Sequence, residues 1–323
     1  MAKKQKKVTP KRAPTKHQLS KWQRQSKIRR IVIIAAAVFL AGILSWVGYG
    51  YYKDYKSDPL REVVVEVNSV PFTMEYYVNM LDAYTAGMNY TVISSYGDYI
   101  TNMVADNIIN AELLRQGAKN LDIEVTAEEI DTEFEEYELP NERVYRDIIS
   151  ADLLQGKLQE YFGSGLNATM EQAHVQVMLV ESEDVADEVI TEVEAGTNFT
   201  VLVEEFSCNS TIEGDLGWLP RELMPNTLIA DAAFNLTVGE IGQPIYDETA
   251  IKNIGTTGGY WLVNVVDRGD HELSDNVKQQ LINKNLNDWF EEWREDSTIE
   301  NLLDEEKKSW AVERVLEGRL TPQ

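Results

Sequence analysis

The pattern of hydrophobic and polar residues divides the chain after residue 60 into strand-like and helix-like segments. Alternating β-branched residues predict a strand at Val63–Val70 that leads into a turn. Apolar residues at helical spacing then predict four helices, at 73–88, 99–119, 126–136 and 140–162. Thr126 and Glu129 have the spacing of a capping box, and Pro140 suits the first turn of the last helix. This region is therefore expected to be mainly helical.

A second region follows a Gly- and Ser-containing boundary at Gly163–Thr169. Its pattern predicts a first strand at 172–180 and three helices, with two further strands after them. The helices are expected at 182–195, 198–206 and 221–236, and the later strands at 244–246 and 259–266. Residues Glu272–Leu320 are predicted to be helical again, in two pieces, with an aromatic-rich face. That face is either buried against the earlier helices or exposed as a surface for unfolded clients.

An uncharged apolar segment, Ile31–Tyr52, precedes all of this. A helix of that length, rising about 1.5 Å per residue, crosses the roughly 30 Å of a hydrocarbon core. Aromatic residues gather at its far end, as they do at membrane interfaces. We expect an uncleaved signal anchor, with a cleaved signal peptide as the alternative.

Charge is distributed unevenly around this segment. Residues 1–30 carry twelve lysines and arginines and no acidic residue, whereas the rest holds 18 basic against all 54 acidic residues. The positive-inside rule then predicts that the basic tail, 1–30, is cytoplasmic and that Lys53 onward is extracytoplasmic. Such a tail can also bind nucleic acid, but its place beside the apolar segment favours anionic lipid and topology, so no nucleic-acid partner is expected.

Composition excludes several kinds of chemistry. Cys208 is the only cysteine, so the chain forms no intramolecular disulfide. One cysteine and three histidines give no zinc constellation, and no nucleotide-binding or Ser-His-Asp motif is present. We therefore predict no metal and no cofactor. The 323 residues allow two or three domains.

The most informative stretch runs from Phe206 to Phe234. Gly214 and Gly217 bracket a point where the backbone is expected to need angles that other residues disfavour. Apolar residues follow at spacings that would turn them toward one hollow: Leu216, Met224, Leu228 and Phe234. On spacing alone, the same residues also suit an ordinary core.

The order of blocks in this stretch resembles the parvulin family of peptidyl-prolyl isomerases. The blocks are Phe206-Ser207, then Gly214–Trp218, then Met224, then Ala232–Glu240, and the resemblance covers roughly residues 172–267. It implies a domain of β-α-α-α-β-β order. It also implies that four residues hold the proline ring: Leu216, Met224, Leu228 and Phe234.

The parvulin resemblance assigns three further positions. Asn209 lies where the family has Cys or Asp, beside the bond that twists. The family's two histidines fall on Val177 and Trp261, while His174 is an odd number of residues from Val177 and so belongs to the opposite strand face. A Val–Trp pair can pack the same layer without a hydrogen-bond network.

The helical region resembles the amino-terminal domain of SurA- and PrsA-like chaperones, through the run from Ala118 to Ile130. A generic helical bundle is the alternative. We expect an α+β chain: a mainly helical SurA/PrsA-like domain formed by both chain ends and a parvulin-like domain, preceded by one transmembrane helix. The expected segments are the tail, the anchor, the helical domain (53–165), the parvulin-like domain (171–270) and C-terminal helices packed on the helical domain (271–320).

Together these features predict a membrane-anchored, extracytoplasmic folding factor. As an isomerase it would act on Xaa-Pro bonds of translocated or unfolded polypeptides, with Asn209 polarising the amide. As a holdase it would bind unfolded chains on the same scaffold without catalysis. A structural subunit of a membrane complex is the third possibility. The retained Gly214–Trp218 block and Met224 favour the isomerase, and the two replaced histidines favour the holdase.

Overall fold

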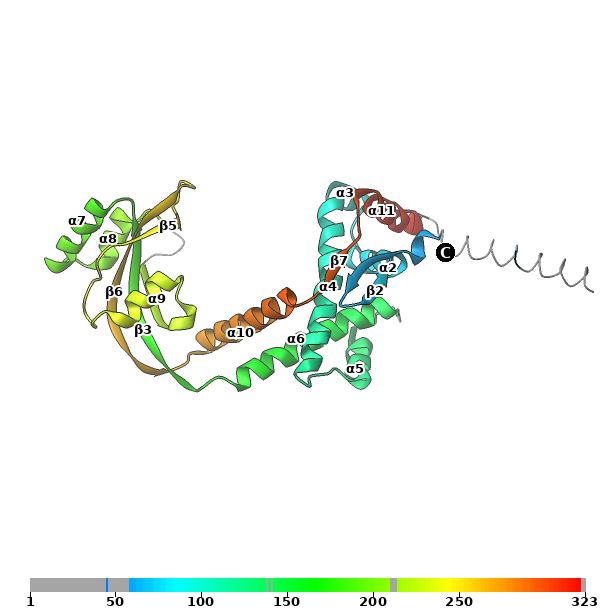
Figure 1. The fold of residues 1–323 in the computed structure, drawn as a ribbon, viewed down its shortest axis with the longest axis horizontal. Coiled ribbons are helices and arrows are strands. Elements are labelled where there is room, and N and C mark those ends of the chain that lie inside the picture. Colours follow the sequence, from blue (N-terminus) through cyan, green and yellow to red (C-terminus); the bar gives the residue numbers. More distant parts are fainter. Residues whose placement is uncertain (1–44, 46–57, 138, 141, 210–213, 321–323) are drawn as a thin grey trace, which may run out of the picture. The chain divides into compact units, whose positions relative to one another are not determined.

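The computed structural model describes residues 58–137, 139–140, 142–209 and 214–320, together with Ser45. The chain divides into two compact units. Among the described residues, unit 1 comprises Ser45, 58–66, 70–101 and 301–320, and unit 2 comprises those within 67–69 and 102–300. Figure 1 labels most of their helices and strands.

The expected basic tail, 1–30, and the expected membrane span, 31–52, lie outside the described residues, apart from Ser45. Among the helices that the structure describes, none combines the length and the apolar character needed to cross a membrane. Both expectations therefore stay predictions.

Unit 1 draws its elements from both ends of the described chain. A short helical turn, η1 (Pro59–Arg61), leads to strand β1 (Val63–Val67) and strand β2 (Val70–Thr73). The expected strand at 63–70 is thus two strands, because Asn68 and Ser69 turn the chain with φ of 48° and 68°. With β7 (Ile299–Asn301), these strands form a three-stranded sheet of order β2-β1-β7.

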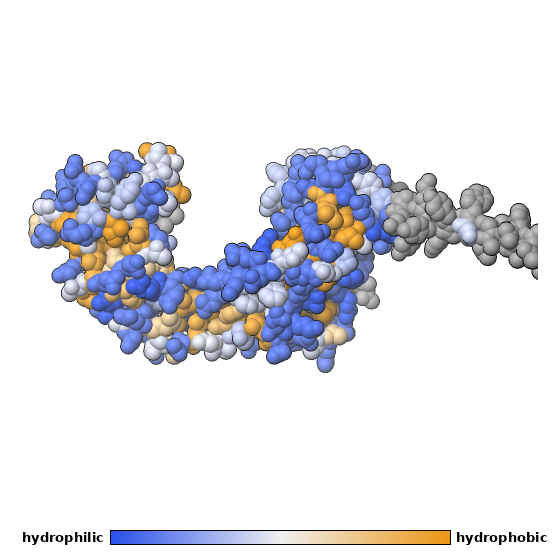
Figure 2. All heavy atoms as spheres, viewed as in Figure 1, coloured by the Kyte–Doolittle hydropathy of each residue, from blue (hydrophilic) through white to orange (hydrophobic). Residues whose placement is uncertain are grey.

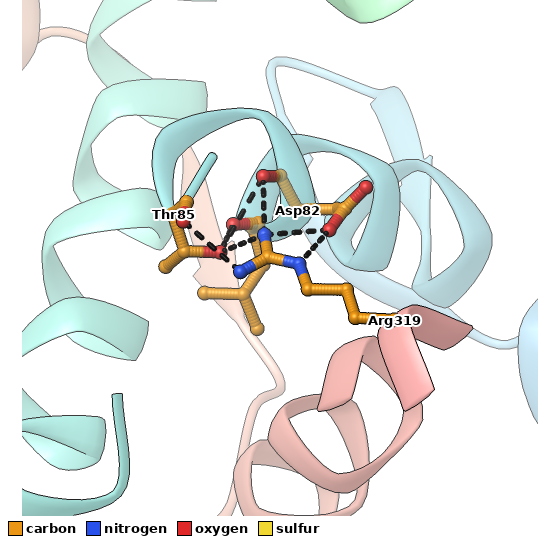
Figure 3. A network of polar contacts seen from close by, with 4 residues as sticks. Asp82, Thr85 and Arg319 are labelled. Carbon is orange, nitrogen blue, oxygen red and sulfur yellow. Dashed lines mark hydrogen bonds and ion pairs between the residues drawn. The ribbon is translucent and has the colours of Figure 1, made fainter. Parts of the chain in front are cut away.

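The helices of unit 1 are α2 (Met74–Tyr84), α3 (Tyr90–Ser95), the beginning of α4 (Gly97–Asn120) and α11 (Glu305–Leu320). Tyr77 of α2 is fully buried, and its hydroxyl donates to the carbonyl of Thr101 at 2.9 Å. Ala311 and Val315 are buried and lie on the inward face of α11. Arg319, near the end of α11, binds the end of α2 (Figure 3).

Unit 2 begins and ends with helices: the rest of α4, then α5 (Ala127–Tyr137) and α6 (Arg143–Ser164), and at its end α10 (Asp275–Glu295). Ala118, Leu154, Leu158 and Leu286 are buried together in one apolar cluster. Trp289 of α10 packs on this cluster, with its ring 5.8 Å from that of Phe162.

Unit 2 also contains the region expected to be parvulin-like. Its elements are β3 (Thr169–Val180), α7 (Glu183–Glu194), α8 (Phe199–Phe206), β4 (Gly214–Pro220), η2 (Arg221–Leu223), α9 (Thr227–Asn235), β5 (Ile245–Ile251) and β6 (Thr257–Glu272). The strands form an antiparallel sheet of order β4-β3-β6-β5. The chain is therefore α+β, as expected.

Each face of this sheet buries its own cluster. Helices α7 and α8 cover one face, where Met178, Val180 and Leu262 are fully buried. Helix α9 covers the other face, on which Val175, Val177 and Leu179 of β3 are fully buried. The strict alternation along β3 explains how one strand serves two cores.

The expected β-α-α-α-β-β order is wrong in one respect, because it lacks β4. Residues 214–220 pair with β3, although no strand was expected there. Gly214 and Gly217 have φ of 79° and 68°, and the pairing register shifts between Val175 and Gln176. A glycine-containing strand with a bulge has no clean alternation, so its pattern resembles that of a loop.

Candidate functional site

Three of the four residues expected to hold a proline ring meet on the α9 face of the sheet. Leu216 of β4, Met224 after η2 and Phe234 of α9 all pack in the same apolar cluster as Val177 and Trp261. Met224 is 8% exposed and Trp261 only 2%. The structure therefore brings together residues from β3, β4, α9 and β6 and from the segment after η2.

Leu228 does not join this cluster. It is half-buried, and the residue after it, Ile229, is fully buried in the cluster instead. The side chain of Asn226 caps α9 by accepting the N–H of Ile229 at 2.9 Å. This start fixes the helical phase so that Ile229, Ala230 and Ala233 face the sheet.

A polar pocket of about 650 Å³ adjoins the apolar cluster. Trp261 and Ala250 belong to both the pocket lining and the cluster. Asn209 also lines the pocket, whereas the four predicted ring-binding residues do not. The other lining residues are Asn226, Asp247, Thr249, Ile251, Lys252, Asn253 and Gly255.

Asn209 follows α8 and is 6% exposed. Its side-chain Nδ2 donates to the carbonyl of Ile251 at 2.8 Å, across the pocket wall. The preceding residue is held too, since the N–H of Cys208 donates to the carbonyl of Leu179 at 2.8 Å. The loop after α8 is thus tied both to β3 and to β5.

Trp261 occupies one of the two expected histidine positions. Its indole Nε1 donates to the Asp247 carboxylate at 2.9 Å. Burial alone would raise the pKa of Asp247, but hydrogen bonds from Thr249, Trp261 and the Ala250 backbone outweigh it and hold the pKa below its usual range. Asp247 is therefore an anionic group fixed at the pocket wall.

Val177 occupies the other expected histidine position and is fully buried. Val177 pairs with Val263 of β6, and Trp261 of β6 pairs with Leu179 of β3. Val177 and Trp261 are therefore diagonal neighbours on the same face of the sheet. No ionisable side chain stands at either position.

His174 lies outside this arrangement. Its ring nitrogen Nε2 is 2.7 Å from the Asp215 carboxylate, and its ring lies 5.6 Å from that of Trp218. Trp218 also contacts His271, with the ring centres 3.8 Å apart and the ring planes tilted by 46°. Because Ala173 and Val175, the neighbours of His174, are buried in the α9 cluster, the histidine belongs to the opposite face.

Sequence reasoning missed Asp247 and Thr249. The signal was present, because an Asp two residues before a Thr favours an Asx turn, in which the carboxylate accepts the later N–H. The structure has this bond at 2.9 Å between Asp247 Oδ1 and the N–H of Thr249.

Two family models match the chain. Residues 172–265 match the PPIC-type PPIASE domain, named Rotamase. The match covers most of the four-stranded sheet and the whole of the apolar cluster and the pocket described above. Residues 19–145 match the SurA-like N-terminal domain.

Curated relatives with sequence similarity carry the name foldase protein PrsA. The protein of Caldanaerobacter subterraneus is 28% identical over 180 residues, covering 50% of this chain and 58% of the relative. That of Halalkalibacterium halodurans is 31% identical over 130 residues (38% and 35%), and that of Bacillus subtilis 28% over 156 residues (47% and 48%). The chain thus spans about a third to three fifths of these relatives' lengths.

Solved structures with similarity include peptidylprolyl isomerase (PrsA) from Bacillus anthracis. It is 16% identical, with a TM-score of 0.35 over 67% of this chain and 97% of that one. PrsA from Bacillus subtilis is 19% identical, with a TM-score of 0.26 over 80% and 93%.

Proposed function

We propose that this chain is an extracytoplasmic foldase that catalyses cis–trans isomerisation of Xaa-Pro bonds in translocated or unfolded polypeptides. Two matches support the proposal: the PPIC-type domain at 172–265 and the relatives named foldase protein PrsA. The single structural observation that carries it is the convergence of Leu216, Met224 and Phe234 with Trp261 in one apolar cluster beside a pocket.

Such a reaction needs no covalent intermediate and no cofactor. The barrier of about 18–20 kcal/mol arises because the amide loses resonance as it twists. A catalyst must therefore hold the proline ring in apolar surroundings and bind the twisted amide better than the planar one. Leu216, Met224 and Phe234 supply the apolar surface, and the polar pocket at Asn209 receives the adjoining backbone.

The electrostatic part of the site differs from that of a site built on two histidines. Val177 offers no polar atom, and the Trp261 N–H is directed to Asp247. Asn209 is the polar side chain predicted to polarise the amide, and its own Nδ2 donates to the carbonyl of Ile251. We infer that ring binding and amide twisting, rather than proton transfer, provide the rate enhancement.

The direct test is catalysed cis-to-trans conversion of a short Xaa-Pro peptide by the full chain. The test variant carries Met224→Ala and Phe234→Ala, and the control is Val201→Ala, at an exposed position of α8. Acceleration that only the double variant loses establishes the isomerase. If the wild type gives no acceleration yet suppresses aggregation of an unfolded protein, the isomerase proposal is wrong and the chain is a holdase.

We further propose that Ile31–Tyr52 anchors the chain in the cell membrane, with residues 1–30 in the cytoplasm and the folded units outside. The uncharged length of the segment and the basic tail before it support this topology. Protease added to intact protoplasts should digest the folded units and leave the tail protected. Digestion of a tag placed at residue 1 in the same sample would contradict this orientation.

A further inference from the structure

Strand β5 carries an irregularity that shapes the polar pocket. Asp247 pairs with Gly259 and Ile251 pairs with Thr257, so residues 248–250 of β5 stand opposite the single residue Gly258. Gly258 has a φ of 86°, a conformation that favours glycine. The three residues 248–250 are called the β5 bulge below. Thr249 and Ala250 of the bulge line the pocket, and Ala250 is also buried in the apolar cluster.

One carboxylate organises both sides of this bulge. Asp247 Oδ1 accepts the N–H of Thr249 at 2.9 Å and the hydroxyl of Thr249 at 2.7 Å. Asp247 Oδ2 accepts the indole N–H of Trp261 at 2.9 Å, from the neighbouring strand β6. The two oxygens thus divide their work, since one fixes the bulge and the other fixes the buried indole.

The far end of the bulge is fixed from a third element. The carbonyl of Ile251 accepts Nδ2 of Asn209, from the loop after α8. The pocket wall is therefore held at its start by Asp247 and at its end by Asn209. Beyond the wall, the β5–β6 hairpin exposes Ile251 by 63% and Ile254 by 76%, and apolar atoms are visible at its outer end (Figure 2).

We propose that Asp247 is a positioning residue of this site: its carboxylate holds the Trp261 indole and the β5 bulge together as one wall of the pocket. This inference rests on the proposed isomerase function. Val177 and Trp261, at the expected histidine positions, make no hydrogen bond to each other. In this proposal the hydrogen bond between Asp247 and Trp261 keeps the site in place instead. Asp247 does not touch the reacting amide in this scheme, and it acts through Trp261 and the bulge.

The substitution Asp247→Asn separates the two tasks. The single carbonyl oxygen of Asn still accepts the Thr249 N–H, so the turn is kept. The amide NH₂ then faces the indole N–H of Trp261, donor against donor. We expect kcat/KM of the full chain for an Xaa-Pro peptide to fall about tenfold, mainly through a higher KM, because a displaced wall weakens binding of the planar and twisted forms alike.

Two further variants make the result specific. Asp187→Asn, on the exposed surface of α7, removes the same charge away from the pocket and should behave as the wild type. Trp261→Phe keeps an aromatic ring and removes the indole N–H. If Asp247 acts through that N–H, Asp247→Asn should have little further effect on kcat/KM in the Trp261→Phe background.

The second readout does not depend on catalysis. The indole N–H resonance of Trp261, identified by its absence from Trp261→Phe, should move in Asp247→Asn and stay unchanged in Asp187→Asn. Wild-type values of both kcat/KM and this resonance in Asp247→Asn would overturn the proposal, as would fully additive losses with Trp261→Phe.

If the wild type lacks isomerase activity, the proposed function fails. The affinity of a proline peptide, measured by titrating the Trp261 resonance, then decides the positioning role: a weaker affinity in Asp247→Asn supports it, and equal affinities overturn it.

Discussion

The guanidinium of Arg319 binds both the carboxylate and the backbone carbonyl of Asp82. The guanidinium donates to Asp82 Oδ1 at 2.9 and 2.7 Å and to the Asp82 carbonyl at 2.9 Å (Figure 3). It also donates to the carbonyl of Thr85 at 3.0 Å and to the Thr85 hydroxyl at 2.8 Å. A cation at the end of α2 satisfies carbonyls that the helix leaves without partners and opposes the negative end of its dipole.

Replacing this guanidinium should loosen unit 1. We expect Arg319→Ala to lower the free energy of unfolding by about 1–3 kcal/mol, since charge-assisted hydrogen bonds to Thr85 and Asp82 are lost. Arg319→Lys should recover only part of this loss, because an ammonium cannot reproduce the planar fork. Urea unfolding measures the change. Arg314→Ala, at an exposed position of the same helix, is the control, and an equal loss in both variants would contradict the prediction.

Gly117 of α4 should not tolerate a side chain. A Cβ at this position would lie 2.8 Å from Cζ2 of Trp289 and 3.2 Å from Cδ1 of Trp293. We expect Gly117→Ala to destabilise unit 2 by about 1–3 kcal/mol, because the indoles must shift in a packed interface. Gly156→Ala, in open space on α6, should instead be neutral or stabilising by up to about 1 kcal/mol. Thermal unfolding of the two variants gives the comparison, and equal midpoints would refute the packing argument.

Glu129 should titrate far below an ordinary glutamate. Hydrogen bonds from Lys157 and from the backbone and hydroxyl of Thr126 lower its pKa to about 2. Because the folded pKa lies below the unfolded value of about 4.3, the carboxylate stabilises the fold above that value. This contribution is lost as the pH falls toward 2. Side-chain NMR titration measures the pKa, and Lys157→Met should raise it; no change in that variant would disprove the assigned cause.

Phe234 and Leu228 should respond differently to truncation. Phe234 packs in the apolar cluster, and the Arg221 guanidinium lies 5.2 Å from its ring centre, whereas Leu228 lies outside the cluster. We expect Phe234→Ala to lower kcat/KM for an Xaa-Pro peptide at least about tenfold, since transition-state binding depends on the ring pocket. Leu228→Ala should cost several-fold less. The reverse ranking would place the proline ring elsewhere.

Local signals predicted local structure well. Thr126 and Glu129 form the expected reciprocal capping box, with the Thr126 N–H donating to Glu129 at 2.7 Å and the Glu129 N–H donating to Thr126 Oγ1 at 3.3 Å. Asn198 caps α8 at the expected start. Pro140 was predicted in the first turn of a helix, but α6 begins at Arg143. A proline is compatible with the turn before a helix as well, and composition alone does not separate these cases.

The candidate site shows the limit of such signals. Leu216, Met224 and Phe234 were predicted together because their blocks have a recognisable order, and they do meet in one cluster. Asp247 escaped prediction because its role depends on the register between β5 and β6. That register pairs Asp247 with Gly259 and Ile245 with Trp261, which brings the Trp261 indole within hydrogen-bond distance of the Asp247 carboxylate. A bulge also hides the alternation by which strands are recognised.

The contact between Arg319 and Asp82 joins two residues that are synthesised at very different times. Residues near position 80 leave the ribosome long before those near position 320, yet α2 is completed by α11, which buries Ala311 and Val315 in unit 1. The four-stranded sheet of unit 2 lies within one continuous stretch, 169–272, and can fold as soon as that stretch emerges. Unit 1 must therefore wait, with part of its apolar surface uncovered, until α11 has been synthesised.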